Sequence, residues 1–416
     1  MRGTTRWSLL LALVLAFGLA LAACGGDDDG DDDDGGAAPA ETDTAADDGG
    51  GASGDPIVIG AAVDLTNQMA PFDGPATTAA QIQVDKINAD GGVSGRPLEL
   101  RVIDHQLDPE RTKSAAIELI DGGAEVLLVT CDVDYATPAV QEAITRGILA
   151  VAPCIGTDQM GPERFGEQGR LAFSIGNVAQ DEGAAMAEYA MDQGWERAAT
   201  ATDNVIVYFQ DVVSAFTARY QELGGEIVVE ESWTQGDGTI QNVVSSLDGA
   251  DVDVIATSTA FDDMPALVSG LRSLDNETPI ICSWSCDGNY WLPPGTNNFY
   301  VVTYASVFGD DPSDDVQTLI GEMEAQDQAP GTGGFITGAA AIDAIAAAIE
   351  QSGGTEGDAL ADAFEGFEGL ETISGAISFS EQFHSVFGRE YRVMEVQDSQ
   401  PAFVELRAAS SPAEID

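Results

Sequence analysis

The feature that most constrains this chain is a repeated alternation of short apolar runs with helical patterns, which begins at residue 57. Two of these runs, at residues 126–130 and 148–153, are almost continuously apolar and stop at small and polar residues. Such runs between helical segments are typical of the central strands of a parallel sheet, which is covered on both faces. Because open parallel sheets bind ligands beyond the carboxyl ends of their strands, we expect the residues after these two runs to form one wall of a ligand crevice.

The alternation of strand and helix patterns occurs in two consecutive blocks. The first block covers residues 57–153 and the second covers residues 181–284. Three stretches are expected to cross between the blocks, at residues 174–177, 305–312 and 372–376. We therefore predict an α/β fold with two Rossmann-like doubly wound lobes that are joined by a three-segment hinge.

The predicted hinge divides the chain into two discontinuous lobes. The first lobe is expected to comprise residues 55–174 and 310–373, and the second to comprise residues 175–309 and 374–416. The body of about 360 residues exceeds what one hydrophobic core usually holds, which favours two lobes. A hinge between such lobes creates a cleft that can close on a small ligand.

The N-terminal region has the pattern of an export signal. Arg2 and Arg6 precede an apolar run at residues 9–22 that is too short for a comfortable membrane span, and small residues lead to Cys24. The Leu-Ala-Ala-Cys stretch resembles the lipobox of bacterial lipoproteins, which implies that residues 1–23 are removed and that Cys24 carries a lipid. The alternative is an ordinary signal peptide with an incidental cysteine. The lipobox predicts an exported protein, lipid-anchored on the outer face of the bacterial cytoplasmic membrane.

Residues 24–54 form an acidic stretch of Asp, Gly, Ala and Thr with almost no bulky apolar side chain. This composition cannot offset the entropy of ordering, so we expect a disordered tether. The formal net charge of the whole chain is −55, and the tether accounts for a minority of its acids. A surface this acidic repels phosphate backbones, which makes nucleic acid a poor partner.

Four cysteines remain after the lipidation site, and an even number in an exported chain suggests disulfides. Cys131 and Cys154 follow successive apolar runs, and successive strands are usually neighbours, so we expect a bond between them. Cys282 and Cys286 are separated by three residues, and we expect a second bond there. The alternative is a metal site, but neither histidine of the chain lies near a cysteine in sequence, so zinc is disfavoured.

Three stretches of the chain carry a family resemblance. Residues 57–66, 87–98 and 102–109 are similar to the opening of the Leu/Ile/Val-binding proteins, and the most specific part is Ile-Asn-Ala-Asp-Gly-Gly-Val-Ser-Gly-Arg-Pro-Leu at 87–98. This resemblance implies a type I periplasmic-binding-protein fold without enzymatic activity or cofactor. It also implies a monomeric receptor that delivers a small polar solute, such as a branched-chain amino acid, an amide or a related compound, to an ABC permease.

The resemblance places solute contacts at three strand ends of the first lobe. The loop at residues 66–74 carries Thr66, Gln68 and Phe72, and Phe72 stands where a large aromatic side chain often covers the ligand. The tip after the third strand carries Asp132 and Tyr135. The tip after the fourth strand runs from residue 153 to 157, and its expected contacts are Cys154 and Thr157.

The second lobe is expected to supply four contacts. Tyr208 resembles the tyrosine of the family's Asp-x-x-x-Tyr-Gly segment, although Phe209 replaces the glycine. Phe261 stands for a family tyrosine at the next tip. Trp284 and Asp287 lie in the loop that normally bears an acid for the ammonium group of the ligand, and the inserted cysteine pair alters that loop.

Two acids depart from the family pattern. Asp132 and Asp134 stand where hydroxyl groups commonly hold the solute carboxylate, and an ionised Asp facing a carboxylate would repel it. This predicts a neutral or cationic solute, or one held by its polar edge. The alternative is that both acids face solvent or cap the following helix, since Asp is a favoured N-cap residue.

Motifs for common enzyme classes are missing from the sequence. It contains no Gly-x-Ser-x-Gly elbow, no phosphate-binding Gly-x4-Gly-Lys loop and no His-Glu-x-x-His. Three functions remain in view: a transport receptor, a ligand sensor of the same fold with a signalling partner, and a tethered enzyme that uses the crevice. The lipid tether favours the transport receptor.

Overall fold

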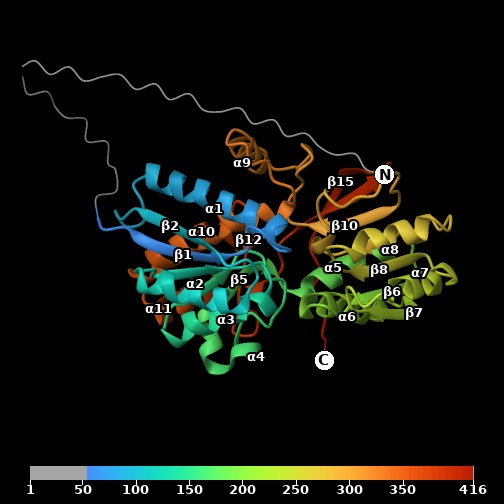
Figure 1. Ribbon diagram of the computed structural model, residues 1–416, viewed down its shortest axis with the longest axis horizontal. Coiled ribbons are helices and arrows are strands. Elements are labelled where there is room, and N and C mark those ends of the chain that lie inside the picture. The colour runs from blue at the N-terminus through green and yellow to red at the C-terminus, as the bar shows by residue number, and fades with distance from the viewer. Residues whose placement is uncertain (1–53, 416) are drawn as a thin grey trace, which may run out of the picture. The chain divides into compact units, whose positions relative to one another are not determined.

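The computed structural model describes residues 54–415, so the expected signal peptide, Cys24 and nearly all of the expected tether lie outside the described residues. Within the described part, the chain forms two α/β lobes (Figure 1). The first lobe is built on a six-stranded sheet in the order β13-β5-β4-β3-β1-β2. Its strands are β1 (Ile57–Val63), β2 (Leu98–Asp104), β3 (Val126–Val129), β4 (Leu149–Ala152), β5 (Ala172–Asn177) and β13 (Ser385–Val386).

All pairings in the six-stranded sheet are parallel, as the continuous apolar runs predict. Helices α1 (Ala70–Ala89) and α10 (Ile336–Ser352) pack together on one side, and α2 (Pro109–Asp121) and α3 (Val133–Thr145) pack together on the other (Figure 1). The segment Gly333–Ser352 is long and apolar enough to cross a membrane, but 78% of its apolar window is buried inside the protein. It is therefore a core helix of this lobe.

The second lobe is built on a seven-stranded sheet in the order β15-β14-β10-β9-β8-β6-β7. Its parallel strands are β6 (Arg197–Asp203), β7 (Glu226–Trp233), β8 (Val254–Ser258), β9 (Ile280–Cys282) and β10 (Phe299–Thr303). Two antiparallel strands, β14 (Tyr391–Gln397) and β15 (Gln400–Arg407), complete one edge.

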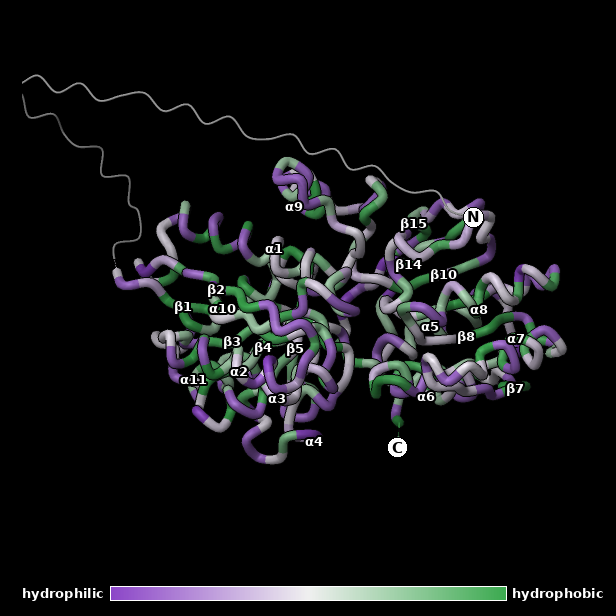
Figure 2. Tube along the Cα trace, in the orientation of Figure 1, coloured by the Kyte–Doolittle hydropathy of each residue, from purple (hydrophilic) through white to green (hydrophobic). Residues whose placement is uncertain are grey.

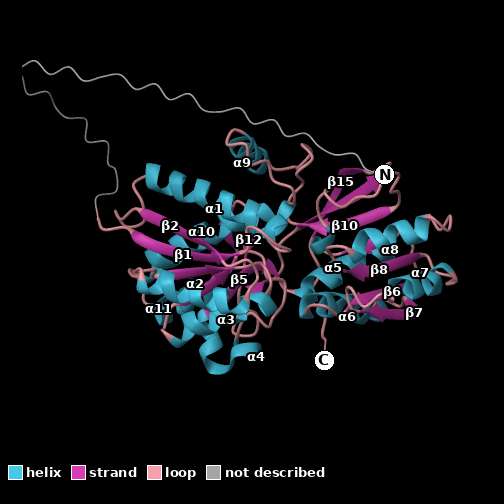
Figure 3. Cartoon of the chain, in the orientation of Figure 1, coloured by secondary structure: helices cyan, strands magenta, loops and turns pink. Residues whose placement is uncertain are grey.

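Four helices cover the two faces of this second sheet (Figure 3). Helices α5 (Ala179–Asp192) and α6 (Val207–Glu222) pack together, and α7 (Ile240–Asp248) packs with α8 (Asp263–Arg272). The alanine-rich α5 is buried along most of its length because small side chains let α6 approach closely. Figure 2 shows the central strands β1, β3 and β4 of the first sheet as mainly hydrophobic.

The chain passes between the two sheets three times, which is the three-segment hinge of the predicted fold class. The first passage follows β5 and the second follows β10. Before the third passage, β13 pairs with β5 in the first sheet, and only then does the chain enter β14 of the second sheet. This passage therefore lies between residues 386 and 391, further along the chain than the 372–376 expected from the sequence. A two-residue strand is too short to show a hydrophobic period.

Several short elements surround these two cores. They are the helices α4 (Pro162–Phe165), α9 (Asp314–Glu324) and α11 (Gly357–Glu365), the 3-10 turns η1 (Gly166–Leu171), η2 (Trp284–Cys286) and η3 (Gly333–Phe335), and the small hairpin β11 (Leu370–Thr372) and β12 (Gly375–Ile377). Of these, η2 and η3 matter for the site because both lie beside the cleft, as their side-chain contacts show below.

Candidate functional site

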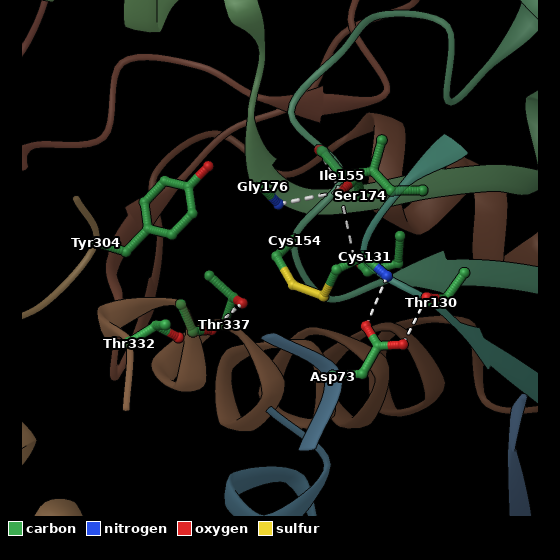
Figure 4. The surroundings of a disulfide bond; sticks show 12 residues. Asp73, Thr130, Cys131, Cys154, Ile155, Ser174, Gly176, Tyr304, Thr332 and Thr337 are labelled. Carbon is green, nitrogen blue, oxygen red and sulfur yellow. Dashed lines mark hydrogen bonds between the residues drawn. A yellow bond between two sulfur atoms is a disulfide. The ribbon is translucent and has the colours of Figure 1, made fainter. Parts of the chain in front are cut away.

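A disulfide joins the tips of the two central strands of the first lobe. Cys131 follows β3 and Cys154 follows β4, and their Cα atoms are 4.8 Å apart (Figure 4). The two strands are neighbours in the sheet, as the prediction of this bond required. The bond fixes the spacing of the two loops that leave the sheet at this edge.

A buried carboxylate ties the same tip to the neighbouring strand and helix. Asp73, in the first turn of α1, is 1% exposed. Its two oxygens accept hydrogen bonds from the backbone N–H of Asp64 (2.7 Å), the hydroxyl of Thr130 (2.5 Å) and the backbone N–H of Cys131 (2.9 Å). Figure 4 shows Asp73 pointing at the end of β3 from below. Burial raises the pKa of Asp73 to about 7, against the lowering effect of these donors.

The two acids that depart from the family pattern have different roles. Asp132 is the N-cap of α3, and its Oδ1 accepts from the backbone N–H of Asp134 and of Tyr135 at 2.9 and 3.2 Å. Asp132 is nevertheless only 3% exposed, and burial raises its pKa to about 7. The carboxylate of Asp134 binds Arg164 at 2.6 Å and also accepts from the backbone N–H of Val207, at the start of α6 in the second lobe.

The wall contributed by the second lobe is aromatic. Trp284 stands in η2 within a loop closed by the Cys282–Cys286 disulfide, which was also expected. Its ring meets Phe72 of the first lobe edge to face, with centroids 5.1 Å apart, and lies 6.1 Å from the ring of Tyr208. Such edge-to-face and tilted contacts are the preferred geometries of aromatic pairs.

A second buried carboxylate lies behind this aromatic wall. Glu182, on α5, is fully buried, and it accepts a hydrogen bond from the hydroxyl of Tyr208 at 2.8 Å and one from the backbone N–H of Trp284 at 2.7 Å. Burial raises the pKa of Glu182 to about 8. Glu182 thus sets the positions of two aromatic residues of the wall.

The two walls enclose a cavity of about 20 Å³. That volume has room for about one or two water molecules, so a solute enters only if the lobes separate or side chains turn. Five of the lining residues are aromatic: Phe72, Tyr208, Phe209, Phe261 and Trp284. The remaining lining residues are Met69, Cys131, Asp132, Ile155, Gly156, Ile206, Ala260 and Ser285.

Five residues that the sequence analysis proposed as solute contacts therefore lie together around one cavity: Phe72, Asp132, Tyr208, Phe261 and Trp284. Among them, Phe261 has a positive φ of 58°. A bulky side chain rarely adopts this left-handed conformation, and such strain tends to collect at ligand sites.

The other proposed contacts lie elsewhere. Thr66 and Gln68 are exposed, and the hydroxyl of Thr66 donates to Asp104 at the end of β2. Tyr135 is half-buried on α3, and Cys154 is held in its disulfide. None of these four is among the residues that line the cavity in the described part of the chain.

Asp287, the expected partner of a solute ammonium group, is buried outside the cavity. It accepts hydrogen bonds from the hydroxyl of Thr303 at 2.7 Å and from the backbone N–H groups of Gly288 and Gly333. Burial raises its pKa to about 6. In this arrangement Asp287 joins η2 to η3.

Three hydrogen bonds join loops of the first lobe to α5 and α6 of the second lobe beside the cavity. The hydroxyl of Thr157 donates to Asp211 on α6 at 2.6 Å, and the side chain of Gln180 on α5 donates to Asp158 at 2.5 Å. The third is the bond from Val207 N–H to Asp134, at 3.1 Å. The structure therefore shows the lobes in contact, with the proposed contact Thr157 used between them.

The sequence analysis missed Asp73 and Glu182, the two buried acids that position the walls. Asp73 lies three residues after Ala70, the first residue of α1, and the only sequence signal is an acid in the first turn of a helix after a strand. Glu182 lies in a helix of small residues, and an acid on such a helix gives no signal of burial. Among residues 54–415, no group of three or more His, Cys, Asp or Glu side chains is arranged to hold a metal ion.

Comparisons with known proteins agree with the fold. The family model described as "Periplasmic binding protein" matches residues 56–401. The Leu/Ile/Val-binding protein homolog 3 of Brucella melitensis is 25% identical over 339 residues, which cover 78% of this chain and 87% of that protein. The leucine-, isoleucine-, valine-, threonine- and alanine-binding protein of Pseudomonas aeruginosa is 21% identical over 341 residues, covering 79% of this chain and 87% of that protein.

Solved structures show the same architecture. The branched-chain amino acid transporter substrate-binding protein LivJ of Streptococcus pneumoniae, in complex with isoleucine, superposes with a TM-score of 0.74 at 18% identity, covering 85% of this chain and 99% of that chain. A solute-binding protein of an ABC transporter from R. palustris, in complex with benzoate, has a TM-score of 0.70 at 18% identity. The match covers 87% of this chain and 98% of that chain. The resemblance predicted from residues 57–109 is confirmed, and this chain belongs to the periplasmic binding protein family.

Proposed function

We propose that this protein is the solute receptor of an ABC importer, which binds a small solute between its two lobes and delivers it to a membrane permease. The observation that supports this most directly is the cavity whose lining residues come from both lobes. A cavity at the junction of two hinged lobes is completed only when the lobes close, so closure reports that a solute is bound. No catalytic step is part of this proposal.

Lipid attachment at Cys24 fits the same function. A lipid on Cys24 would keep the two lobes at the membrane that holds the permease. This places the receptor on the outer face of the cytoplasmic membrane. The relatives are named as binding proteins for leucine, isoleucine and valine, and amino acids are accordingly the first solutes to test.

The contact between Gly156 and Tyr208 gives a specific test of closure. A Cβ atom added at Gly156, in the first lobe, would lie 2.6 Å from Cε2 of Tyr208 in the second lobe. Real Cβ atoms are not found this close to ring carbons, and Tyr208 cannot turn away without losing its bond to Glu182. Gly156→Ala should therefore hold the lobes apart, and within the first lobe the added Cβ meets the carbonyl oxygen of Asn177 at 3.2 Å, which requires only a small local shift.

The experiment measures closure and binding together. A thermal-shift panel should first identify a solute that binds, because binding raises the melting temperature. Small-angle scattering of the wild type should then show a decrease in the radius of gyration when this solute is added. Gly156→Ala should abolish the decrease and weaken binding at least tenfold. Gly321→Ala, on α9 where no atom lies within 4 Å of the added Cβ, is the matched control and should behave as wild type. Unchanged closure in Gly156→Ala would contradict the proposal.

A further inference from the structure

Three backbone donors beside the cleft are occupied by carboxylates of the protein. Proteins usually hold an anionic solute with free N–H groups at strand tips and helix N-termini. Here the N–H of Cys131 at the β3 tip donates to Asp73, and the N–H of Trp284 beside β9 donates to Glu182. The N–H of Val207, in the first turn of α6, donates to Asp134.

The backbone N–H groups in the first turn of α3 are also bonded to a carboxylate of the protein. Asp132 accepts from the N–H groups of Asp134 and Tyr135, which are the donors that would otherwise face the cavity at this helix end. Both hydrogen bonds use Oδ1. Within the described part of the chain, Oδ2 of Asp132 has no hydrogen-bond donor, and Asp132 lines the cavity. A carboxylate of the solute placed against Asp132 would therefore meet another acid.

The side chains that line the cavity favour a cation over an anion. No Lys, Arg or His is among the described residues that line it, whereas five aromatic side chains do. The face of an aromatic ring attracts cations through its quadrupole, and the attraction grows when the site is desolvated. Arg164, beside Asp132 and Asp134, is paired with Asp134 at 2.6 Å.

We infer that the solute of the proposed receptor is a small organic cation, held by the aromatic faces of Phe72, Tyr208, Phe261 and Trp284 with Asp132 as its counter-ion. This inference rests on the proposed function and names the class of solute that the same cavity selects. The net charge of −55 acts in the same direction, because it concentrates cations near the protein and repels anions. The aromatic walls supply apolar contact to the alkyl groups of such a cation.

The test uses isothermal titration calorimetry with the full-length protein to compare a cation with a neutral molecule of the same shape, with an anion and with an amino acid. The probes are choline, its neutral isostere 3,3-dimethylbutan-1-ol, benzoate and isoleucine. Choline should bind at least tenfold more tightly than the neutral isostere, and benzoate should not bind. Equal binding of the two isosteres, tighter binding of benzoate or isoleucine, or no binding of choline would each overturn the inference.

One variant separates charge from structure. Asp132→Asn retains a good helix N-cap, so α3 should keep its stability. The variant should weaken the binding of choline at least tenfold and leave the binding of the neutral isostere unchanged. Equal losses for both probes, or no loss for choline, would remove Asp132 as the counter-ion.

The same experiment distinguishes failure of the inference from failure of the proposed function. If isoleucine or benzoate binds and Gly156→Ala weakens that binding, the receptor function stands and the preference for cations is wrong. If none of the four probes binds, the inference is wrong, and the thermal-shift panel decides whether the receptor function is wrong as well. If choline binds and Gly156→Ala weakens its binding, both are supported.

Discussion

The two walls of the cleft are held in place by different means. In the first lobe, the tips of β3 and β4 are joined by the Cys131–Cys154 disulfide, and Asp73 ties α1 to the ends of β1 and β3 through three hydrogen bonds. In the second lobe, the disulfide closes a loop of only three residues around Trp284, and the wall is held by aromatic contacts and by Glu182. One wall is fixed through its backbone and the other through its side chains.

This difference predicts which wall adapts to a solute. Backbone hydrogen bonds and a covalent link between two strands leave the first wall little freedom, because moving it requires breaking buried bonds. Aromatic rings can turn about two dihedral angles while their backbone stays in place, except for Tyr208, whose hydroxyl is bound to Glu182. We therefore expect the second wall to rearrange around a solute and the first to act as its fixed reference.

The largest expected effect comes from removing Asp73. Asp73→Ala leaves the N–H groups of Asp64 and Cys131 and the hydroxyl of Thr130 buried without acceptors. Each buried unpaired donor costs about 1–3 kcal/mol, so we expect the free energy of unfolding to fall by about 4 kcal/mol. Urea denaturation followed by circular dichroism measures this.

Two variants serve as references for Asp73→Ala. Asp85→Ala, an exposed acid on the same helix, should change the stability by less than about 0.5 kcal/mol. Glu182→Ala leaves two donors unpaired, on Tyr208 and Trp284, and should cost about 2–3 kcal/mol. If Glu182→Ala cost more than Asp73→Ala, the second wall would be the more firmly held, and the comparison would be reversed.

Removing the disulfide of the first wall should cost more stability than removing the disulfide of the second wall. Cys131 and Cys154 are 23 residues apart in sequence, and Cys282 and Cys286 are 4 apart. Loop-closure entropy predicts a loss of about 3 kcal/mol when the first pair is changed to serine and about 2 kcal/mol for the second pair. Denaturation of the two double variants, each compared with the wild type, gives both numbers.

The second pair also has a local effect that entropy does not describe. Without Cys282–Cys286, the loop that carries Trp284 is free to move, so solute affinity should fall more than in the Cys131–Cys154 variant. Mass mapping of non-reduced peptides checks that both bonds form in the native protein. Free thiols at Cys131 and Cys154 would contradict the view that the first wall is covalently fixed.

The sequence predicted the fold because the strands of both lobes have a clear pattern. β3 and β4 lie within the apolar runs at 126–130 and 148–153, and the Cys131–Cys154 bond followed from the adjacency of these two successive strands. The position of β13 did not follow, since a two-residue strand has no period and its pairing with β5 depends on the whole hinge.

The site was harder to predict because burial depends on contacts between distant segments. Glu182 is buried only because α6 and the loop after β9 cover it, and its own helix carries no sign of this. Asp287 was expected to meet the solute, but the N–H of Gly333, 46 residues away in sequence, accounts for part of its burial. Thr66 and Gln68 were expected from their place after β1, and the length of that loop leaves them exposed.

The buried acids predict a dependence of stability on pH. Burial raises the pKa of Asp73, Asp132 and Asp181 from 3.8 to about 7, and that of Glu182 from 4.5 to about 8. Between these limits the folded state binds more protons than the unfolded state, so the free energy of unfolding falls as the pH rises from about 4.5 to 8. The melting temperature measured by calorimetry should therefore be higher at pH 5.5 than at pH 8.

A double variant, Asp181→Asn with Glu182→Gln, tests the source of this dependence. Both substitutions keep the shape of the side chain and remove the titration, so the fall in melting temperature between pH 5.5 and 8 should become smaller. A profile that is flat in the wild type, or unchanged in the double variant, would show that these two acids are not the buried titrating groups.

The smallest expected effect concerns the hydrogen bond from Thr157 to Asp211, which joins the fixed wall to the second lobe. Thr157→Val keeps the volume of the side chain and removes the donor, and loss of the short bond to Asp211 costs the closed form about 1 kcal/mol. Solute affinity should drop about fivefold, while the unfolding of each lobe stays the same. Thr318→Val, on the exposed face of α9, is the control. If Thr157→Val lowered stability without changing affinity, this bond would contribute to the folding of the protein and not to closure. Asp211 on α6 would then have to be counted as part of the fixed wall.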